Sequence, residues 1–572
     1  MARGGAEGRP AGSGIGQRLR EAWYASPIHA WRIARHGPDE PAVIITDIWP
    51  GDPDAGREIL EGAFVVSGQS VQVGADPWDA DGLASATLDT LHRFDWLRDL
   101  RDLGGDAARR RARDLVVSWI GRYGRWDRLA WRPDVLGCRI AAWVGTYPFF
   151  VESAEDTFRH SMLDSLATQH RHLVGVLPSL PPDLGQIDAM RGALIGAVCL
   201  GSGSETLQPL VGHLIRAVEA QILPDGGHAS RSPNIQAAVL AGLVDARAAL
   251  RAAQGAALDT AVDTAGHEPT PVLDETIGRM TGVLRLLRHG DGGLALFNAT
   301  TEETAWKLDS LLARTESKTR AISSAPDTGF ERLASGRTAL IVDTGVPDAR
   351  IGAGVGVIHA GTLAFELSVG KERLIVNCGA APGDPRWGSA LKASAAHSTL
   401  VVDDINSTEI RPDGSLGRRP QSVRVERRED GGSHWLEVEH DGYLGSHGLI
   451  HCRRFYLASG GDDLRGEDVL SYAGAPGQKP VEAVIRFHLH PRIAASIVQN
   501  GAAALLRMPS GTGWRLRVSG CGVALNESVY FGDRGRLQRT RQLVIRLPLD
   551  QVREDGEVSV KWALRREDRR GG

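Results

Sequence analysis

The distribution of apolar residues changes character near residue 290. Before that point apolar residues recur at helical spacing; residues 87–103, for example, place Leu91, Leu97 and Leu100 on one face. Pro and Gly breaks, as in LPSLPPDLG at 177–185, separate such segments. We therefore predict helices over residues 87–103, 107–120, 136–147, 155–177, 186–200, 205–222, 233–252 and 273–288.

The second half of the chain has the pattern of short strands. Its apolar segments are rich in β-branched residues and are bounded by Gly, Asp and Asn turns, which is typical of an antiparallel sandwich or barrel. We predict strands within residues 293–299, 337–345, 361–370, 372–379, 398–404, 434–443, 483–491, 513–520 and 541–549.

These patterns predict two domains after a short N-terminal tail. Residues 1–18 are rich in Gly and Arg and are expected to form a flexible tail. Residues 19–288 are expected to form a helical domain, which includes a linker of weak periodicity at 253–272, and residues 289–572 a large β-sandwich. We see no strict repeat period, so the helices are not expected to form a regular solenoid.

Composition excludes several classes of protein. The 66 Lys and Arg against 70 Asp and Glu give a net charge of -4, without the basic excess of a nucleic-acid-binding protein, although a local basic groove for an acidic polymer is compatible with it. The five cysteines are odd in number, widely spaced and never arranged as CxxC, so neither a disulfide framework nor a zinc ribbon is expected.

The N-terminal sequence also bears on localisation. It has no apolar core of a Sec signal peptide, and no run of 18 apolar residues predicts a transmembrane helix elsewhere. Taken by itself, the sequence predicts a cytoplasmic protein.

Several motifs, in their order and spacing, carry a resemblance to a known family. They are LPDGGHASRSP at 223–233, RMTGVLRLLRHGDGGLALFNA at 279–299, HAGTLAFELSVGKERLIVNCG at 359–379, AHSTLVVDD at 396–404, HDGY at 440–443 and HCRRFY at 451–456. Together with the helical first half, they resemble the heparinase II/III-like polysaccharide lyases. The resemblance implies an α+β fold with an N-terminal incomplete (α/α) toroid and a C-terminal antiparallel β-sandwich. It also implies an acidic polysaccharide as partner and the cell envelope or periplasm as the place of work.

The resemblance implies cleavage of a uronic-acid polysaccharide by β-elimination. The reaction needs a group that neutralises the substrate carboxylate, a base for the C5 proton and an acid for the leaving oxygen. His397 lies where the family has its catalytic His, and it is the first candidate for base or neutralising group. Tyr443 is a candidate base or acid if a cationic neighbour lowers its pKa.

Further candidates come from loops and aromatic segments. His228 and Arg231 lie in the Gly-rich turn after Asp225; His228 is a candidate base and Arg231 a candidate donor to a substrate carboxylate. Candidate substrate contacts in the helical half are the amide of Gln186, the rings of Trp126 and Trp131, and the guanidinium of Arg125.

The predicted chemistry requires no cofactor. Some relatives carry a structural metal in the sandwich, so the resemblance allows a divalent ion, zinc or calcium, bound by His440, His451 and Asp404.

The sequence departs from the family at two informative places. Active members carry an Asn at the start of the helix that precedes the Pro-Asp-Gly turn; the corresponding stretch here, GQIDAMRGAL at 185–194, offers the amide of Gln186 but no Asn. Active members carry a catalytic Tyr just after the Ser-Pro of the Pro-Asp-Gly turn, and Ile235 stands there in this chain. Three explanations stay open: another Tyr, such as Tyr443 or Tyr147, serves; His228 replaces the lost base; or the protein works without catalysis in glycan binding or envelope assembly. A hydrolase would instead need two carboxylates flanking the bond, such as Asp225 and Asp404.

Overall fold

The computed structural model describes residues 15–34, 36–80, 82–181, 183–256, 269–348, 357–382, 384–474, 479–549 and 556–567. They divide into two compact units. The first unit comprises residues up to Gln221 together with Ala238–Ile277, and the second comprises Ile222–Ala237 together with the chain from Gly278 onward. The short segment Ile222–Ala237, which contains the Pro-Asp-Gly turn, therefore belongs with the sandwich, although the sequence placed it in the helical domain.

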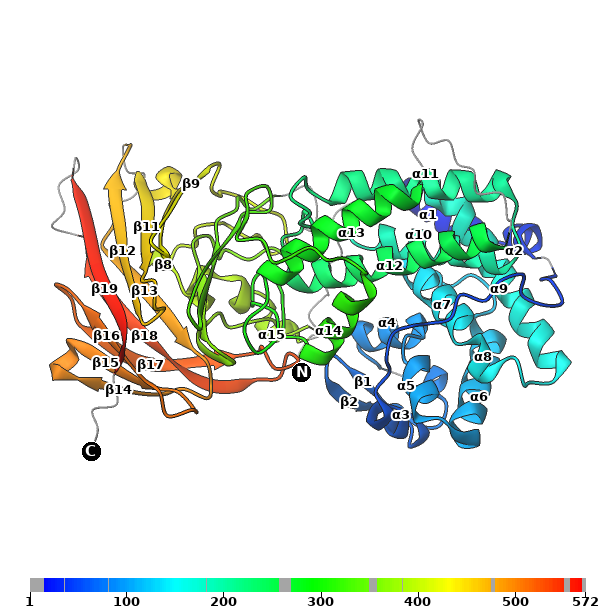
Figure 1. Cartoon of the computed structure of the whole chain (residues 1–572). Coiled ribbons are helices and arrows are strands. Elements are labelled where there is room, and N and C mark those ends of the chain that lie inside the picture. The colour runs from blue at the N-terminus through cyan, green and yellow to red at the C-terminus, as the bar shows by residue number, and fades with distance from the viewer. Residues whose placement is uncertain are drawn as a thin grey trace, which may run out of the picture. The chain divides into compact units, whose positions relative to one another are not determined.

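Helices make up most of the first unit (Figure 1). They are α1 (Ile15–Tyr24), α2 (Pro27–Ile33), α3 (Pro53–Leu60), α4 (Ser85–Arg93), α5 (Leu97–Leu103), α6 (Gly105–Tyr123), α7 (Pro133–Gly145), α8 (Tyr147–Phe150), α9 (Asp156–Val176), α10 (Gln186–Cys199) and α11 (Ser204–Gln221), with most of α12 (Pro233–Gly255) and the start of α13 (Pro269–Leu286). A hairpin of β1 (Ala63–Val66) and β2 (Gln69–Gln72) lies between α3 and α4.

Close backbone approach explains how the central helices α7 and α10 pack. A Cβ atom on Gly137 of α7 would lie 2.1 Å from the Asp188 carbonyl oxygen, and one on Gly192 of α10 would lie 2.1 Å from the Gly137 carbonyl oxygen. Only glycine fits at these two positions.

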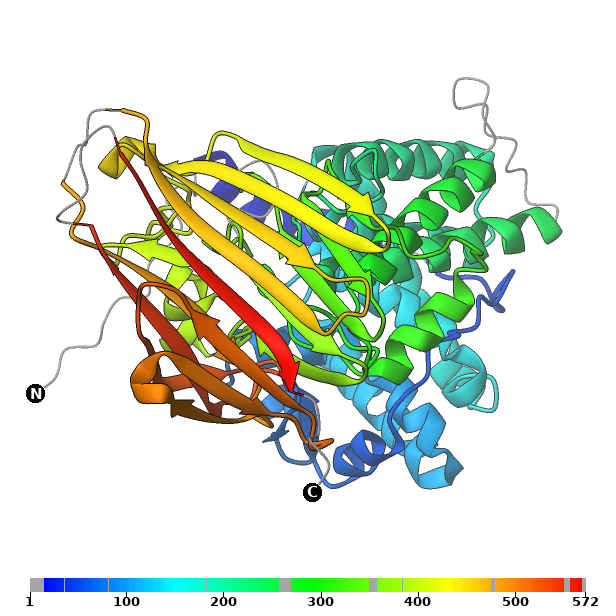
Figure 2. The same ribbon diagram turned by 60° about the vertical axis from the view of Figure 1, so that its left-hand side comes forward.

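The second unit contains two large antiparallel sheets (Figure 2). The eight-stranded sheet has the order β14 (Ala494–Val498), β15 (Ala503–Arg507), β16 (Gly513–Val518), β19 (Glu557–Glu567), β12 (Asp463–Tyr472), β11 (Leu449–Leu457), β10 (Ser433–Tyr443) and β9 (Val423–Asp430). The other has the order β17 (Val523–Tyr530), β18 (Gln538–Pro548), β13 (Glu482–Leu489), β7 (Glu372–Val376), β6 (Phe365–Val369), β5 (Thr338–Asp343), β4 (Phe330–Ser335) and β3 (Ser324–Ala325), with β8 (Leu400–Val402) beside β13. Helices α14 (Ala305–Arg314), α15 (Pro385–Gly388) and α16 (Leu444–His447) lie in the connections.

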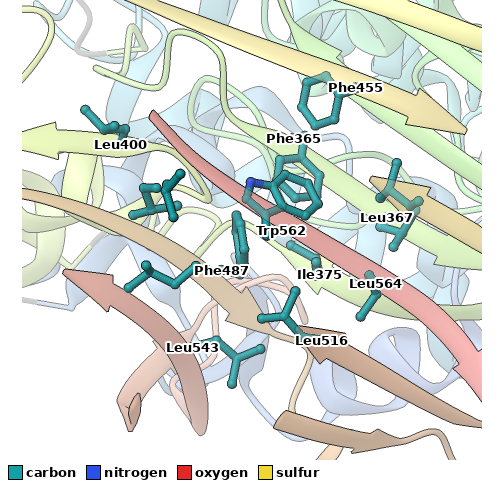
Figure 3. Packing of buried hydrophobic residues seen from close by; sticks show 14 of the residues in the cluster. Phe365, Leu367, Ile375, Leu400, Phe455, Phe487, Leu516, Leu543, Trp562 and Leu564 are labelled. Atoms are coloured by element: carbon teal, nitrogen blue, oxygen red, sulfur yellow. The ribbon is translucent and has the colours of Figure 1, made fainter. Parts of the chain in front are cut away.

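An aromatic core joins the two sheets (Figure 3). The ring of Phe365 on β6 stacks on that of Trp562 on β19, with centroids 5.8 Å apart and planes within 8°. Phe455 and Phe487 pack edge-on against Trp562 from either sheet. The interlocking of rings from facing sheets is the packing expected of a β-sandwich, and the predicted fold class is confirmed.

Local expectations were wrong in three places. Helix α1 begins at Ile15, inside the predicted tail. The helix predicted over 87–103 is two helices, because Phe94 adopts a left-handed φ of 63° and is buried among aromatic rings. Residues 293–299 form no strand: Asn298 and Ala299 both have positive φ, and the segment is an irregular buried loop. Residues 257–268 of the predicted linker lie outside the described part of the chain.

None of the described helices is both long enough and apolar enough to cross a bilayer.

Candidate functional site

The Pro-Asp-Gly turn is held against the sandwich by its aspartate. Thr328 donates its backbone N–H (2.7 Å) and its hydroxyl (2.6 Å) to the two carboxylate oxygens of Asp225, and the Gly227 N–H donates to the same carboxylate (2.9 Å). A side chain on Gly227 would collide with Thr328, whose hydroxyl oxygen would lie 1.6 Å from the added Cβ. Asp225 thus has a structural role in this turn.

Arg231 lies in the same segment and is buried in an ion pair. Its guanidinium contacts the Asp343 carboxylate, donates to the Thr328 carbonyl (2.7 Å) and the Gly329 carbonyl (3.3 Å), and lies over the Phe330 ring at 5.2 Å. Both side chains are less than a tenth exposed. The predicted donor to a substrate carboxylate therefore holds a carboxylate of the protein itself.

A chain of hydrogen bonds connects this segment with the predicted catalytic histidine. The Asn298 side-chain nitrogen donates to the Arg231 backbone carbonyl (3.0 Å), and the Asn298 side-chain oxygen accepts from the backbone N–H of His359 (3.1 Å). His359 Nδ1 lies 3.2 Å from His397 Nε2, and His397 Nδ1 lies 2.9 Å from the Ala393 carbonyl. The structure thus brings His397 into one network with Arg231.

The partners fix the proton positions in this histidine pair. The Ala299 N–H donates to His359 Nε2 (3.1 Å), so the ring proton of His359 is on Nδ1 and is donated to His397 Nε2. His397 then carries its proton on Nδ1 and donates it to Ala393. Burial lowers the pKa of His397 to about 4 and keeps it neutral, but the Nε2 lone pair that a base would use is already occupied.

His228 is also an internal residue. It is 1% exposed, its Nδ1 accepts from the Ser230 N–H (3.0 Å), and its own backbone N–H donates to the Gln236 side chain (2.7 Å). Burial lowers the pKa of His228 to about 4. Gln236 in turn donates to the Gly226 carbonyl (3.0 Å) and the Met280 carbonyl (3.1 Å), so this network fixes the turn.

Tyr443 lies in the core of the sandwich. It is 0% exposed, and its hydroxyl donates to the Leu400 carbonyl (2.9 Å). Burial raises the pKa of Tyr443, and this effect is larger than the lowering of the pKa by the nearby Arg418 guanidinium. Tyr443 was a candidate base or acid on the condition that a cationic neighbour lowers its pKa, and this condition is not met.

The neighbouring histidines form a second relay. The Gly442 N–H donates to His440 Nδ1 (2.9 Å), His440 Nε2 lies 3.3 Å from His451 Nδ1, and His451 Nε2 lies 2.9 Å from Asp468. Arg453 donates to the same carboxylate at 2.6 Å. Burial alone would raise the pKa of Asp468, but Arg453 and His451 hold it at about 2, so a carboxylate anion ends the relay.

The predicted metal ligands are not assembled. Within the described part of the chain, no three His, Cys, Asp or Glu side chains are grouped so that they could hold a metal ion. His440 and His451 use their ring nitrogens in the relay, whereas the Asp404 side chain is 90% exposed and lies 3.8 Å from Arg486. The structure therefore does not bring His440, His451 and Asp404 together as the ligand set predicted for zinc or calcium.

The remaining candidates belong to the helical unit. Gln186, at the start of α10, accepts from the amide of the buried Gln221 (3.0 Å). Trp131 is 1% exposed and donates its indole N–H to the Tyr123 carbonyl (2.8 Å), so it is a core residue. Trp126 is half-buried, with its ring 6.0 Å from that of Tyr24, and Arg125 is exposed. These two side chains stay candidates for contacts at the surface of this unit.

Comparison with known proteins identifies the family. The family model described as "Heparinase II/III-like, C-terminal" matches residues 317–563. FtsZ-localized protein C of Caulobacter vibrioides is 30% identical over 576 residues, which cover 96% of this chain and 94% of that protein. The chain belongs to the heparinase II/III-like family. Its fold is also that of heparinase III (TM-score 0.69, 13% identity, 96% of this chain and 91% of that one) and of a mutant heparan sulfate lyase HepC from Pedobacter heparinus (0.61, 14%, 97% and 89%).

The heparinase II/III-like motifs mark structural networks in this chain. The sequence assigned no role to His359, Asn298 or Asp343, which connect the predicted residues. His359 and Asn298 lie within the family motifs at 359–379 and 279–299, and Asp343 lies in the strand predicted over 337–345. Ile235, at the place of the family's Tyr, lies half-buried on α12 and supplies no proton. The site is a set of buried, hydrogen-bonded networks, of which the one through Arg231, Asn298 and His359 joins the Pro-Asp-Gly segment to the sandwich.

Proposed function

We propose that this protein uses the polysaccharide-lyase scaffold without catalysis and acts in envelope assembly together with FtsZ. The observation that carries the proposal is the internal saturation of the predicted proton-transfer groups. His397 has both ring nitrogens engaged, and Tyr443 donates its hydroxyl to a backbone carbonyl in the core.

Proton transfer in β-elimination requires a group within hydrogen-bond reach of the substrate. His228, His397 and Tyr443 are each no more than 2% exposed, and Arg231 is committed to Asp343. To use His397 as a base, the protein would have to break the His359 bond inside the sandwich unit. Leaving buried donors and acceptors unpaired costs about 1–3 kcal/mol for each group.

The similarity to FtsZ-localized protein C supports FtsZ as the proposed partner. FtsZ-localized protein C matches this chain along nearly its whole length at 30% identity. That name describes localisation with a protein, whereas the heparinase III and HepC structures are related to this chain by fold. The acidic polysaccharide predicted as partner stays a prediction.

The first test is an ultraviolet absorbance assay with heparan sulfate, alginate, chondroitin and polygalacturonate. β-Elimination creates an absorbing C4–C5 double bond, and we expect no increase for the purified protein. A steady increase that His397→Ala abolishes would refute the non-catalytic proposal. The second test is co-sedimentation with polymers of Caulobacter vibrioides FtsZ, where we expect the protein in the pellet; recovery in the supernatant alone would contradict the FtsZ part of the proposal.

A further inference from the structure

The outward face of the eight-stranded sheet carries a cross-strand row of aromatic and basic side chains that is interrupted at one position, Ala563. Successive register partners are Arg428 on β9, Trp435 on β10, Tyr456 on β11, Arg465 on β12, Ala563 on β19 and Arg517 on β16. We call these six residues the outer row. With strands about 4.8 Å apart, the row extends roughly 24 Å across the sheet.

The centre of the outer row is an aromatic pair. The Trp435 and Tyr456 rings have centroids 5.0 Å apart at 47°, and the Arg465 guanidinium lies over Tyr456 at 5.4 Å. Trp435 is 40% exposed. Single exposed apolar residues are ordinary on protein surfaces, but here the two rings are adjacent and lie between hollows.

Two hollows lie on either side of Trp435. One, of about 400 Å³, is lined by Trp435, Tyr456, Arg465, Ala563 and Arg517 among others. The other, of about 440 Å³, is lined by Trp435 and Arg428 together with acidic side chains of β9 and β10. Because Ala563 is small, the floor of the first hollow is low between the flanking arginines.

The charges of the outer row are not fully compensated. Arg465 pairs with Asp463 at 2.7 Å, but Arg428 and Arg517 have no ion pair with a carboxylate among the residues that the structure describes. Both are exposed and lie toward opposite ends of the row. A ligand with an apolar centre and carboxylates on both sides would satisfy the rings and both arginines.

We propose that the outer row binds an acidic peptide segment of a partner protein, with an apolar side chain between Trp435 and Tyr456 and carboxylates at Arg428 and Arg517. This inference rests on the proposed function, in which the partner is a protein. Trp, Tyr and Arg are the residues that most often dominate the energetics of protein interfaces.

The neighbouring row distinguishes a peptide from a polyanionic glycan. About 7 Å along the strands lie Glu437, Arg454, Glu467 and Lys561, whose signs alternate and which pair with one another. Glu437 and Glu467 would repel a polymer with a carboxylate on every unit. A peptide carries its charges at discrete positions and avoids this repulsion. Such a peptide would be bound through side chains and not by adding a strand to the sheet, because a sheet face presents side chains and only a sheet edge has free backbone groups.

The test uses the full chain and Caulobacter vibrioides FtsZ as the probe in biolayer interferometry. We expect Trp435→Ala with Tyr456→Ala to weaken binding at least tenfold, and Arg428→Glu with Arg517→Glu to weaken it similarly and to remove most of its salt dependence. The matched controls are Trp306→Ala, at a tryptophan on α14 that is 46% exposed and lies beside Lys307, and Arg411→Glu, at an exposed arginine of a loop. Both should bind like the wild type.

The outcomes separate the site from the proposed function. Unchanged FtsZ binding by both double variants would overturn the outer row as the docking site and leave the FtsZ proposal standing. No binding of FtsZ by the wild type would overturn both. Binding of polygalacturonate that the double variants lose, with FtsZ binding unaffected, would assign the row to a glycan and overturn the peptide. Circular dichroism spectra and melting curves like those of the wild type are required of each variant.

Discussion

The buried ion pair between Arg231 and Asp343 should hold the Pro-Asp-Gly segment to the sandwich. In Asp343→Ala, the guanidinium would keep the carbonyls of Thr328 and Gly329 but would lose the one carboxylate that it contacts among the residues that the structure describes. Removing one partner of a buried pair typically costs about 3–5 kcal/mol, because the other charge is left uncompensated.

Hydrogen exchange measured by mass spectrometry is the suitable assay, because it reports on local opening of this segment while global unfolding of two units need not be two-state. A loss of about 3 kcal/mol corresponds to a roughly 100-fold faster exchange of protected amides in residues 222–237, provided that exchange is limited by the opening equilibrium. The double variant Arg231→Met with Asp343→Leu should recover much of the protection, because it leaves no buried charge.

The pair of Arg288 and Asp309, in which the carboxylate is exposed, provides the control. Its atoms are 2.7 Å apart, close to the distances in many buried pairs, but the Asp309 side chain is 67% exposed. Asp309→Ala should therefore cost only about 0.5 kcal/mol. If Asp343→Ala accelerated exchange no more than Asp309→Ala, or if the double variant exchanged faster than Asp343→Ala, the reasoning would be refuted.

Three further predictions concern stability. An unfolded His takes up a proton below its ordinary pKa of 6.5, but folded His397 does so only below a pKa of about 4, so the free energy of unfolding should fall by about 3 kcal/mol per such histidine between pH 6.5 and 4 and level off below. Urea unfolding measured across this pH range should show a weaker dependence of the free energy of unfolding on pH for His397→Gln than for the wild type, and an equal dependence would contradict the assignment. Gly227→Ala should lower the melting temperature because its Cβ meets Thr328, whereas Gly121→Ala, in an open position on α6, should keep or raise it through helix propensity worth up to about 1 kcal/mol; similar melting temperatures would count against the steric account. Tyr443→Phe should cost about 1 kcal/mol in urea unfolding through its lost hydrogen bond and leave FtsZ binding unchanged; a loss of binding without a loss of stability would assign the phenol to function.

Helices and strands were predicted correctly where the spacing of apolar residues and the turn residues at the ends indicated the same element. Helices such as α9 and α10 agree with their predicted ranges within a few residues, because apolar spacing and Gly or Pro breaks both mark them. The break at Phe94 escaped prediction because its apolar ring continues the helical pattern while its backbone leaves it. Strand β9 escaped because it is a highly charged edge strand with no buried alternation.

The sequence motifs identified part of the candidate site, including His397 and Arg231, but not His359, Asn298 or Asp343, and the hydrogen-bonding state of the identified residues could not be predicted from motifs. A histidine before a strand has the same sequence signature whether its Nε2 faces a cleft or a second histidine. His359 decides between these states, and it lies 38 positions away from His397 along the chain. The metal site was predicted wrongly for a related reason. His440 and His451 are cross-strand partners, but the carboxylate beside them is that of Asp468 on the next strand, and the Arg453 guanidinium also donates to this carboxylate.

The two buried networks also indicate why such motifs persist in a chain that we propose to be non-catalytic. Each histidine in them is neutral, accepts one hydrogen bond and donates another, so replacement by an apolar residue would leave a donor and an acceptor unpaired inside the sandwich unit. Retention of these histidines is therefore explained by the stability of the fold alone. Their presence in a sequence of this family carries little information about activity unless the solvent exposure of the free nitrogen is also known, and the exposed aromatic and basic residues of the outer row are a better place to look for what this protein binds.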